Sequence, residues 1–241
     1  MTAASGSDLA RPLSMSPVRA VIFDLDGCLV DSEPHSLAAL VGEMQTIGLP
    51  RTTVEEVRER FLGVSMADIC RDIERRTGGP VPADFIDRVE ARLFRAYALR
   101  LRPMAGADRL LDRLEVAGLA MAIATGGSVR RMHETLRLGG LASRFAGRAF
   151  SADEVPRGKP APDLFLKAAA VLGVPPDRCA VLEDSPHGIA GACAAGMRAV
   201  GFTGGSHLEG LQAAHRGLLL EAGASQVVGR LDEAFAALCG P

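Results

Sequence analysis

The sequence predicts an α/β protein in which a doubly wound parallel sheet carries a helical bundle inserted after its first strand. Three observations support this prediction. An apolar run at 20–23 is typical of a buried strand, the stretch 34–102 has helical periodicity without a convincing strand, and strand-like and helix-like segments alternate from residue 103 onward. Such alternation favours a parallel sheet covered by helices. The 241 residues suffice for one large domain, or for a core domain with an insertion.

The first strand follows a polar start. Residues 1–16 are small and polar, contain proline and lack the apolar centre of a signal peptide, so we expect a flexible tail. The run Ala20-Val21-Ile22-Phe23 has the β-branched and aromatic residues of a strand buried on both faces. We expect the core domain to comprise residues 17–33 and 103–241.

The inserted bundle is expected at 34–102. Apolar residues between 37 and 44 recur at helical spacing, and the Gly-Leu-Pro string at 48–50 ends that helix. Either Thr52 or Thr53 can cap a second helix, with acidic residues in its first turn. Two further helices are predicted at 65–76 and 82–100.

The remainder of the chain is expected to complete the sheet. Short apolar runs predict strands, and glycines mark the ends of several helices between them. Strands are predicted at 119–124, 148–151, 179–183, 199–202 and 226–228. Helices are predicted at 107–117, from 125–128 to 138, and at 162–172, 188–195, 207–215 and 231–239.

Composition argues against several classes of function. The net charge of −2 gives no obviously basic surface, so we expect no nucleic-acid partner. No apolar stretch reaches the roughly 18 residues that span a membrane, so we expect no membrane partner. The five cysteines are irregularly spaced and form no CxxC pair, which argues against a zinc site or a disulfide framework. Reduced thiols in a cytoplasmic protein fit this pattern better.

Two carboxylates stand at the end of the first predicted strand. Asp24 and Asp26 are followed by Gly27, at the carboxyl end of a strand, where open α/β sheets bind their ligands. A divalent cation or a proton would relieve their mutual repulsion. The chemistry predicted is a metal-assisted nucleophile with an acid/base partner. The alternative interpretation is a turn with two solvated aspartates, and Cys28 beside them is more typical of a small buried residue than of a nucleophile.

Two further strand ends fall on the same predicted edge. Thr125-Gly126-Gly127 offers a hydroxyl and free backbone N–H groups at a helix start, which suits a phosphate, although a helix cap with a flexible turn is the alternative. Glu183-Asp184-Ser185 again places acids after a buried strand, and such oxygen ligands favour Mg²⁺. Alternatively, Asp184 caps the helix that follows, or capping and metal binding divide between Ser185 and Asp184.

Lys159 lies in a constrained loop. A glycine precedes it, and prolines follow at 160 and 162. A lysine held in this way can neutralise a phosphate and the carboxylate that attacks it. The alternative interpretation is a solvated loop lysine.

These strings resemble the four motifs of the haloacid dehalogenase (HAD) superfamily, in the order and spacing of that family. The strings are Asp-Leu-Asp-Gly-x-Leu-Val-Asp-Ser-Glu at 24–33, Ala-Thr-Gly at 124–126, Gly-Lys-Pro-Ala-Pro-Asp at 158–163 and Glu-Asp-Ser-Pro-His-Gly at 183–188. The helical insert resembles the small cap of the β-phosphoglucomutase-like and sugar-phosphate phosphatase branch. The resemblance implies a Rossmann-like core with a mobile cap over the site.

The resemblance also implies roles for individual residues. Asp24 would form an aspartyl-phosphate, and Asp26 would protonate the leaving oxygen and then activate water. Thr125, the Gly126 N–H and Lys159 would bind the phosphoryl group. Mg²⁺ would be held by the Asp24 carboxylate, the Asp26 carbonyl and Asp184, with Glu183 nearby. Because Asp26 is an acid, the family pattern favours phosphoryl transfer over dehalogenation.

The sequence favours a Mg²⁺-dependent phosphatase of a small phosphorylated metabolite, such as a sugar or sugar-acid phosphate. The alternative is a β-phosphoglucomutase-like isomerase. Enzymes of that type carry a phosphate-binding arginine after Gly-Val-Ser, whereas Gly63-Val64-Ser65 is followed here by Met66. A non-catalytic binding protein is disfavoured because every expected catalytic residue is present. A monomer is expected because the cap closes the site without a partner subunit. Candidate cap contacts to the substrate are Glu33, His35, Ser65, Met66 and Arg92.

Overall fold

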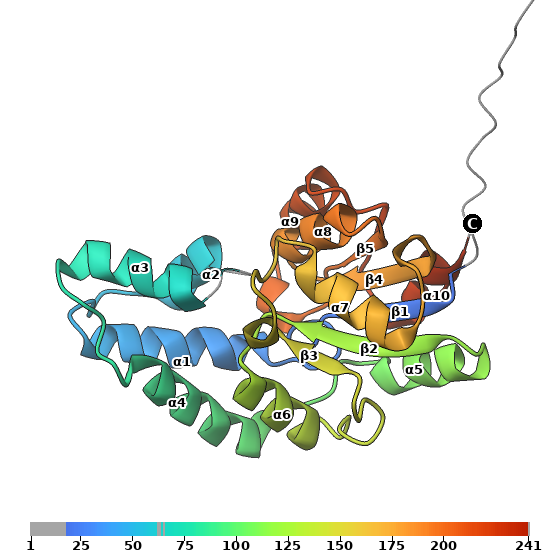
Figure 1. Ribbon diagram of the computed structural model, residues 1–241. Coiled ribbons are helices and arrows are strands. Elements are labelled where there is room, and N and C mark those ends of the chain that lie inside the picture. The colour runs from blue at the N-terminus through green and yellow to red at the C-terminus, as the bar shows by residue number, and fades with distance from the viewer. Residues whose placement is uncertain (1–17, 62–63, 65, 241) are drawn as a thin grey trace, which may run out of the picture.

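The computed structural model describes residues 18–61, 64 and 66–240, and within them a single six-stranded parallel sheet forms the centre of the molecule (Figure 1). The strand order is β3-β2-β1-β4-β5-β6, so β1 lies in the middle and the chain winds outward to both sides. This doubly wound arrangement confirms the predicted fold class. The strands are β1 (Ala20–Phe23), β2 (Ala120–Thr125), β3 (Ala149–Ser151), β4 (Cys179–Glu183), β5 (Arg198–Phe202) and β6 (Gln226–Val228).

The register of the central strands brings three sequence motifs to one edge. Phe23 of β1 pairs with Ile123 of β2 and with Leu182 of β4. All three strands run in the same direction, so the residues that follow these positions emerge side by side. The two aspartates after β1, the threonine that ends β2 and the two acids at the end of β4 therefore meet at the carboxyl edge of the sheet.

Helices cover both faces of the sheet, as parallel strands buried on both sides require. On one face α5, α6 and α10 pack in a cluster that includes Phe23, Ile123 and Leu182. On the other face α7, α8 and α9 pack against Ile22, Ala122 and neighbouring strand residues. These helices are α5 (Ala107–Val116), α6 (Val129–Leu138), α7 (Asp163–Leu172), α8 (Pro186–Ala194), α9 (Gln212–Glu221) and α10 (Leu231–Cys239).

Of the five helices between β1 and β2, the first four lie beyond the carboxyl ends of the strands (Figure 1). The first and last of them, α1 and α4, pack along each other. Val57, Ile73, Val89 and Leu93 are buried between the helices of this group, which explains its helical periodicity. The bounds are α1 (Glu33–Thr46), α2 (Val54–Phe61), α3 (Met66–Thr77) and α4 (Phe85–Arg100).

The prediction of a helix at 207–215 is wrong. A short 3₁₀ turn, η3 (Ser206–Leu208), stands there instead, and α9 begins only at Gln212. Gly210 separates the two with a φ of +77°, a left-handed conformation that glycine adopts readily and that ends a helix. The other 3₁₀ turns are η1 (Ala152–Glu154) and η2 (Pro176–Arg178).

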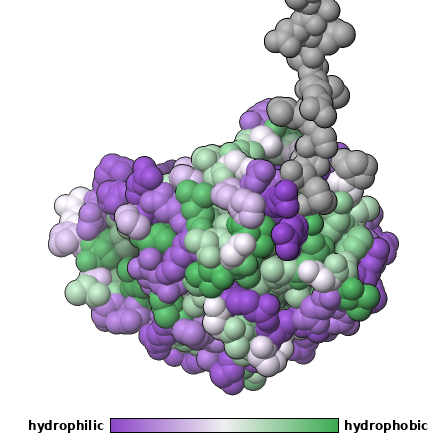
Figure 2. All heavy atoms as spheres, turned by 45° about the vertical axis from the view of Figure 1, so that its right-hand side comes forward, coloured by the Kyte–Doolittle hydropathy of each residue, from purple (hydrophilic) through white to green (hydrophobic). Residues whose placement is uncertain are grey.

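Among the described residues, no helix is both long and apolar enough to cross a bilayer. Hydrophilic residues are spread over the face shown in Figure 2, with smaller hydrophobic groups among them. All five cysteines are free thiols.

Candidate active site

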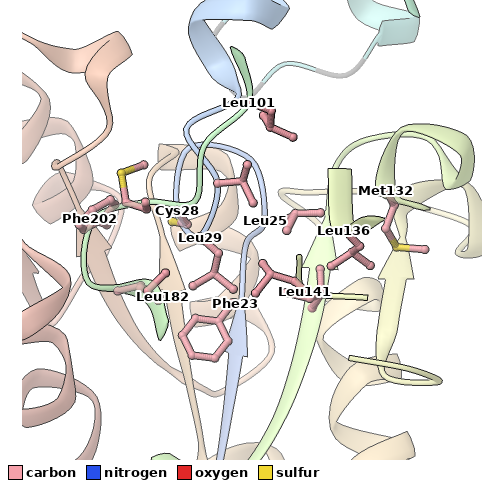
Figure 3. Packing of buried hydrophobic residues seen from close by; sticks show 14 of the residues in the cluster. Phe23, Leu25, Cys28, Leu29, Leu101, Met132, Leu136, Leu141, Leu182 and Phe202 are labelled. Carbon is pink, nitrogen blue, oxygen red and sulfur yellow. The ribbon is translucent and has the colours of Figure 1, made fainter. Parts of the chain in front are cut away.

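The loop after β1 is held by its own apolar residues. Leu25 and Leu29 are completely buried and point into the cluster that contains Phe23 (Figure 3). The alternation of apolar and acidic residues therefore fixes the loop while Asp24 and Asp26 remain at the edge of the sheet, 6% and 8% exposed. Two nearly buried aspartates do not fit the interpretation of a solvated turn.

Lys159 lies between two carboxylates. Its Nζ is 2.5 Å from Asp24 Oδ1 and 2.6 Å from Glu183 Oε2, and its side chain is 7% exposed. Burial alone would lower the pKa of Lys159, but the Asp24 and Glu183 carboxylates raise it above its ordinary value. Lys159 is therefore a fixed cation and not a solvated loop residue. Burial raises the pKa of Asp24, whereas the Lys159 ammonium opposes that rise.

Asp26 is the centre of a hydrogen-bond network. Its Oδ1 accepts hydrogen bonds from Ser32 Oγ at 2.6 Å and from Tyr97 OH at 3.4 Å, and forms an ion pair with Arg131 Nη2 at 3.0 Å. Its Oδ2 accepts a hydrogen bond from Thr125 Oγ1 at 3.3 Å. The carboxylate is thus oriented by groups from four separate elements.

The Thr125-Gly126-Gly127 loop faces this network. Thr125 Oγ1 accepts a hydrogen bond from the Gly127 N–H at 3.0 Å while it donates to Asp26. The cap of α6 is formed by another residue, because Ser128 Oγ accepts from the Arg131 N–H. The Thr125 hydroxyl is therefore available at the site, and the alternative interpretation of this string as a helix cap applies to Ser128.

Asp184 lies opposite Asp24. Ligand atoms of Asp24, Cys28 and Asp184 lie within 4.8 Å of one another. The helix cap of α8 is Ser185, whose side chain accepts from the Gly188 N–H, so Asp184 is not used for capping. Capping and acid functions divide between Ser185 and Asp184, one of the possibilities that the sequence left open.

Two of these three residues offer ligand atoms that suit a hard cation. Asp24 and Asp184 offer carboxylate oxygens, the ligands that Mg²⁺ prefers. Burial raises the pKa of the Cys28 thiol well above its ordinary value, so it stays protonated and is a poor ligand for Mg²⁺. The predicted fourth acid, Glu183, is turned elsewhere: its oxygens accept from Lys159 and from the Ser185 N–H.

Two histidines contact Asp184. His207 Nε2 lies 3.2 Å from Asp184 Oδ2, and His215 Nε2 lies 2.6 Å from the Asp184 carbonyl oxygen. Burial would lower the pKa of His207, but its pairing with the Asp184 carboxylate raises it. Such partners orient the ligands of metal sites.

Glu33 and His35, at the start of α1, lie beside the Asp26 network. Glu33 Oε1 accepts from Arg131 Nη2 at 2.9 Å, and the His35 ring meets the Tyr97 ring edge-on at 6.2 Å between centroids. Burial raises the pKa of Glu33, and Arg131 opposes that effect.

The other predicted cap residues are not brought to this network. Arg92 forms a two-pronged ion pair with Glu43 Oε1, at 2.9 and 2.8 Å, between α4 and α1. Met66 begins α3 and packs partly buried against the core cluster. Ser65 lies outside the described residues.

Five residues of the site were missed by the sequence analysis. Ser32, Tyr97 and Arg131 contact Asp26, and His207 and His215 contact Asp184. One signal was present, because His207 follows the Gly204-Gly205 pair just after β5, another strand end on the same edge. Ser32 lies within the 24–33 string, six positions from Asp26. Tyr97, Arg131 and His215 have no local signal, because their partners are distant in sequence.

Comparison with known proteins gives consistent matches. A family model described as "Hydrolase: haloacid dehalogenase-like hydrolase" matches residues 18–196. Hexitol phosphatase A of Escherichia coli (strain K12) is 31% identical, over 76% of this chain and 82% of that protein. The 6-phosphogluconate phosphatase of the same organism is 31% identical, over 80% and 86%. The crystal structure of a conserved haloacid dehalogenase-like protein of unknown function from Agrobacterium tumefaciens has a TM-score of 0.75 at 37% identity, covering 91% of this chain and 96% of that chain.

Proposed function

The chain belongs to the haloacid dehalogenase-like hydrolase family and is a phosphatase; from this premise we propose that it hydrolyses phosphorylated sugars or polyols through an aspartyl-phosphate, with Mg²⁺ as cofactor. The observation that carries the proposal is the meeting of Asp24, Asp26, Thr125 and Lys159 at one sheet edge. These are the groups that transfer of a phosphoryl group needs: a nucleophile, an acid, a hydroxyl donor and a cation.

In the first step Asp24 attacks the phosphorus atom. A new bond forms between phosphorus and a carboxylate oxygen of Asp24, and the bond to the leaving oxygen breaks. Asp26 donates its proton to that oxygen, so that the product leaves as a neutral alcohol. Lys159, fixed between Asp24 and Glu183, balances the charge that the phosphoryl oxygens bring.

In the second step a water molecule attacks the phosphorus atom of the aspartyl-phosphate. Asp26, now a carboxylate, accepts a proton from the attacking water, and the phosphorus–oxygen bond to Asp24 breaks to release inorganic phosphate. Ser32, Tyr97 and Arg131 hold the Asp26 carboxylate in place for both proton transfers.

We propose that Asp24 and Asp184, with the Asp26 carbonyl, hold Mg²⁺. A bound cation would neutralise the phosphate and favour the ionised form of Asp24, whose pKa burial raises. In this proposal Glu183 forms an ion pair with Lys159 and is not a ligand of the cation.

Met66, the first residue of α3, favours hydrolysis over isomerisation. Met66 stands where the mutase pattern has an arginine, and its side chain packs against the core cluster. Arg92, a possible substitute, is paired with Glu43. A mutase must bind a second phosphate, and neither residue offers it a free cation.

We propose further that residues 34–102 act as a cap over a core formed by 17–33 and 103–241. The cap covers the site within one chain, so we propose that the active form is a monomer. A cytoplasmic location is proposed because all five cysteines are free thiols. Sedimentation velocity and cell fractionation test these two proposals.

The experiment that tests the function is phosphate release with Mg²⁺ across sugar, polyol and sugar-acid phosphates. β-Glucose 1-phosphate with a trace of the bisphosphate is run in parallel for conversion to glucose 6-phosphate. We expect phosphate release, abolished by chelation and in Asp24→Asn. Isomerisation without release would establish the mutase instead.

A further inference from the structure

Arg131 and Glu33 form an ion pair directly beside Asp26. Arg131 Nη2 lies 2.9 Å from Glu33 Oε1 and 3.0 Å from Asp26 Oδ1, and Arg131 Nη1 donates to Ser36 Oγ at 3.1 Å. The Nε of Arg131 has no hydrogen-bond partner among the described residues. One guanidinium from the core helix α6 thus joins the acid/base residue to the first turn of α1.

If the proposed function is correct, the Arg131–Glu33 pair lies close to the leaving group of the substrate. If Asp26 protonates the leaving oxygen, that oxygen lies within hydrogen-bond distance of the Asp26 carboxylate. Ser32 and Tyr97 also contact Asp26 but are at most 2% exposed, and Thr125 is the proposed donor to the phosphoryl group. The side chains of Arg131 and Glu33 keep 16% and 15% of their surface exposed, so a substrate can reach them.

The charges of the pair determine what can lie there. When Asp26 carries the proton that it donates, Arg131 and Glu33 form a neutral pair whose carboxylate belongs to Glu33. The adjacent N–H donors and carboxylate acceptor match a hydroxyl group, which both donates and accepts. A carboxylate or a second phosphate would meet the Glu33 carboxylate as a like charge, which disfavours it.

We propose that the Arg131–Glu33 pair is a specificity-determining element. It binds a neutral hydroxyl on the carbon next to the phosphoester and rejects substrates that carry a second anion there. The substrate class is therefore polyol and sugar monophosphates, in which the carbon beside the ester bears a hydroxyl.

Matched esters test this directly. In 2-hydroxyethyl phosphate and 2-phosphoglycolate, the carbon next to the ester carbon is CH₂OH in one and a carboxylate in the other. Glycerol 3-phosphate and 3-phosphoglycerate both carry a hydroxyl on that carbon and differ one carbon farther out, so they measure how far the discrimination extends. Glucitol 6-phosphate and 6-phosphogluconate are the control pair, because their difference lies far from the ester. We expect the unmodified protein to prefer the neutral ester by about tenfold or more in kcat/KM in the two-carbon pair, and to discriminate little in the control pair.

Glu33→Gln removes the repelling charge and keeps the size of the side chain. We expect it to lower the preference for the neutral short esters about tenfold while leaving the control pair unchanged. The matched control is Glu90→Gln. Glu90 is a buried acid of α4 that accepts from Ser128 and lies 3.5 Å from Arg130, the neighbour of Arg131, and it has no contact with Asp26. Glu90→Gln should retain the full preference.

The outcomes separate this inference from the function. Equal kcat/KM for both short esters in the unmodified protein, a measurement that needs no variant, would overturn the inference. An unchanged preference in a folded Glu33→Gln, or the same loss in Glu90→Gln, would also overturn it. Absence of phosphate release from every ester with Mg²⁺ would overturn the proposed function, and the inference with it.

Discussion

Gly27 lies so close to Asp184 that a Cβ atom at position 27 would stand 2.1 Å from Asp184 Oδ2. The φ of Gly27 is +83°, in the left-handed region. The absence of a side chain therefore serves two purposes: it permits the turn after Asp26, and it lets the ends of β1 and β4 place their acids together.

Gly27→Ala is expected to abolish most activity, because Asp184 must move to admit the methyl group. A displacement of about 1 Å costs on the order of a hundredfold in rate. Gly78→Ala is the matched control, since Gly78 also has a positive φ, +73°, but has open space around it. It should lose only the roughly 1–2 kcal/mol of left-handed strain, with full activity. Equal kcat in the two variants would show that the contact with Asp184 is unimportant.

His207→Asn is expected to weaken Mg²⁺ binding about 10- to 100-fold, because Asp184 Oδ2 loses the group that orients it. Isothermal titration of the metal-free protein with Mg²⁺ measures this directly. His133→Asn, on the exposed side of α6, is the control. If both variants bind Mg²⁺ like the unmodified protein, His207 has no role in the metal site.

At a pH where Asp24 and Glu183 are ionised, Lys159→Met should destabilise the metal-free protein by about 3–5 kcal/mol, because both would be left as unpaired buried charges. Urea unfolding in the presence of chelator measures the change. Lys167→Met is the control: its pair with Glu154 at 3.2 Å is partly exposed and contributes about 0–1 kcal/mol. A Lys159→Met variant as stable as the control would mean that the carboxylates are protonated or solvated.

The metal-free protein should lose stability as the pH rises. Burial raises the pKa of both Asp24 and Glu183, so each binds its proton more tightly in the folded state than in the unfolded state. The resulting stabilisation is complete below the ordinary carboxyl pKa of about 4 and is lost as the pH rises through the raised values.

Tm in chelator should therefore fall as the pH rises above the ordinary carboxyl pKa of about 4, and less steeply in Asp24→Asn. Asp232→Asn is the control, because Arg109 lowers the pKa of Asp232, which gives the opposite sign. A slope that is identical in Asp24→Asn would contradict the assignment of this titration to the site.

The sequence was sufficient to predict the sheet, the inserted helices and the strand ends that carry Asp24, Thr125 and Asp184. These features are local: an apolar run defines each strand, and the polar residues directly after it lie at the same edge. Arg131 and Tyr97 were not predictable, because they contact Asp26 from 105 and 71 positions away and belong to helices with ordinary amphipathic patterns. The prediction of a helix at 207–215 was wrong because Gly210 has a positive φ, which separates the turn that carries His207 from α9.

The central claim is that Asp24 becomes phosphorylated during turnover. To test it, the protein is mixed with a substrate that it hydrolyses and the reaction is quenched rapidly with acid. Mass spectrometry then examines the tryptic peptide 20–51, which trypsin releases by cleavage after Arg19 and after Arg51. We predict one added phosphoryl group on Asp24 in this peptide, and none in Asp24→Asn. Turnover with no phosphorylated peptide in a time-resolved series, or with the phosphoryl group on another residue, would contradict the mechanism.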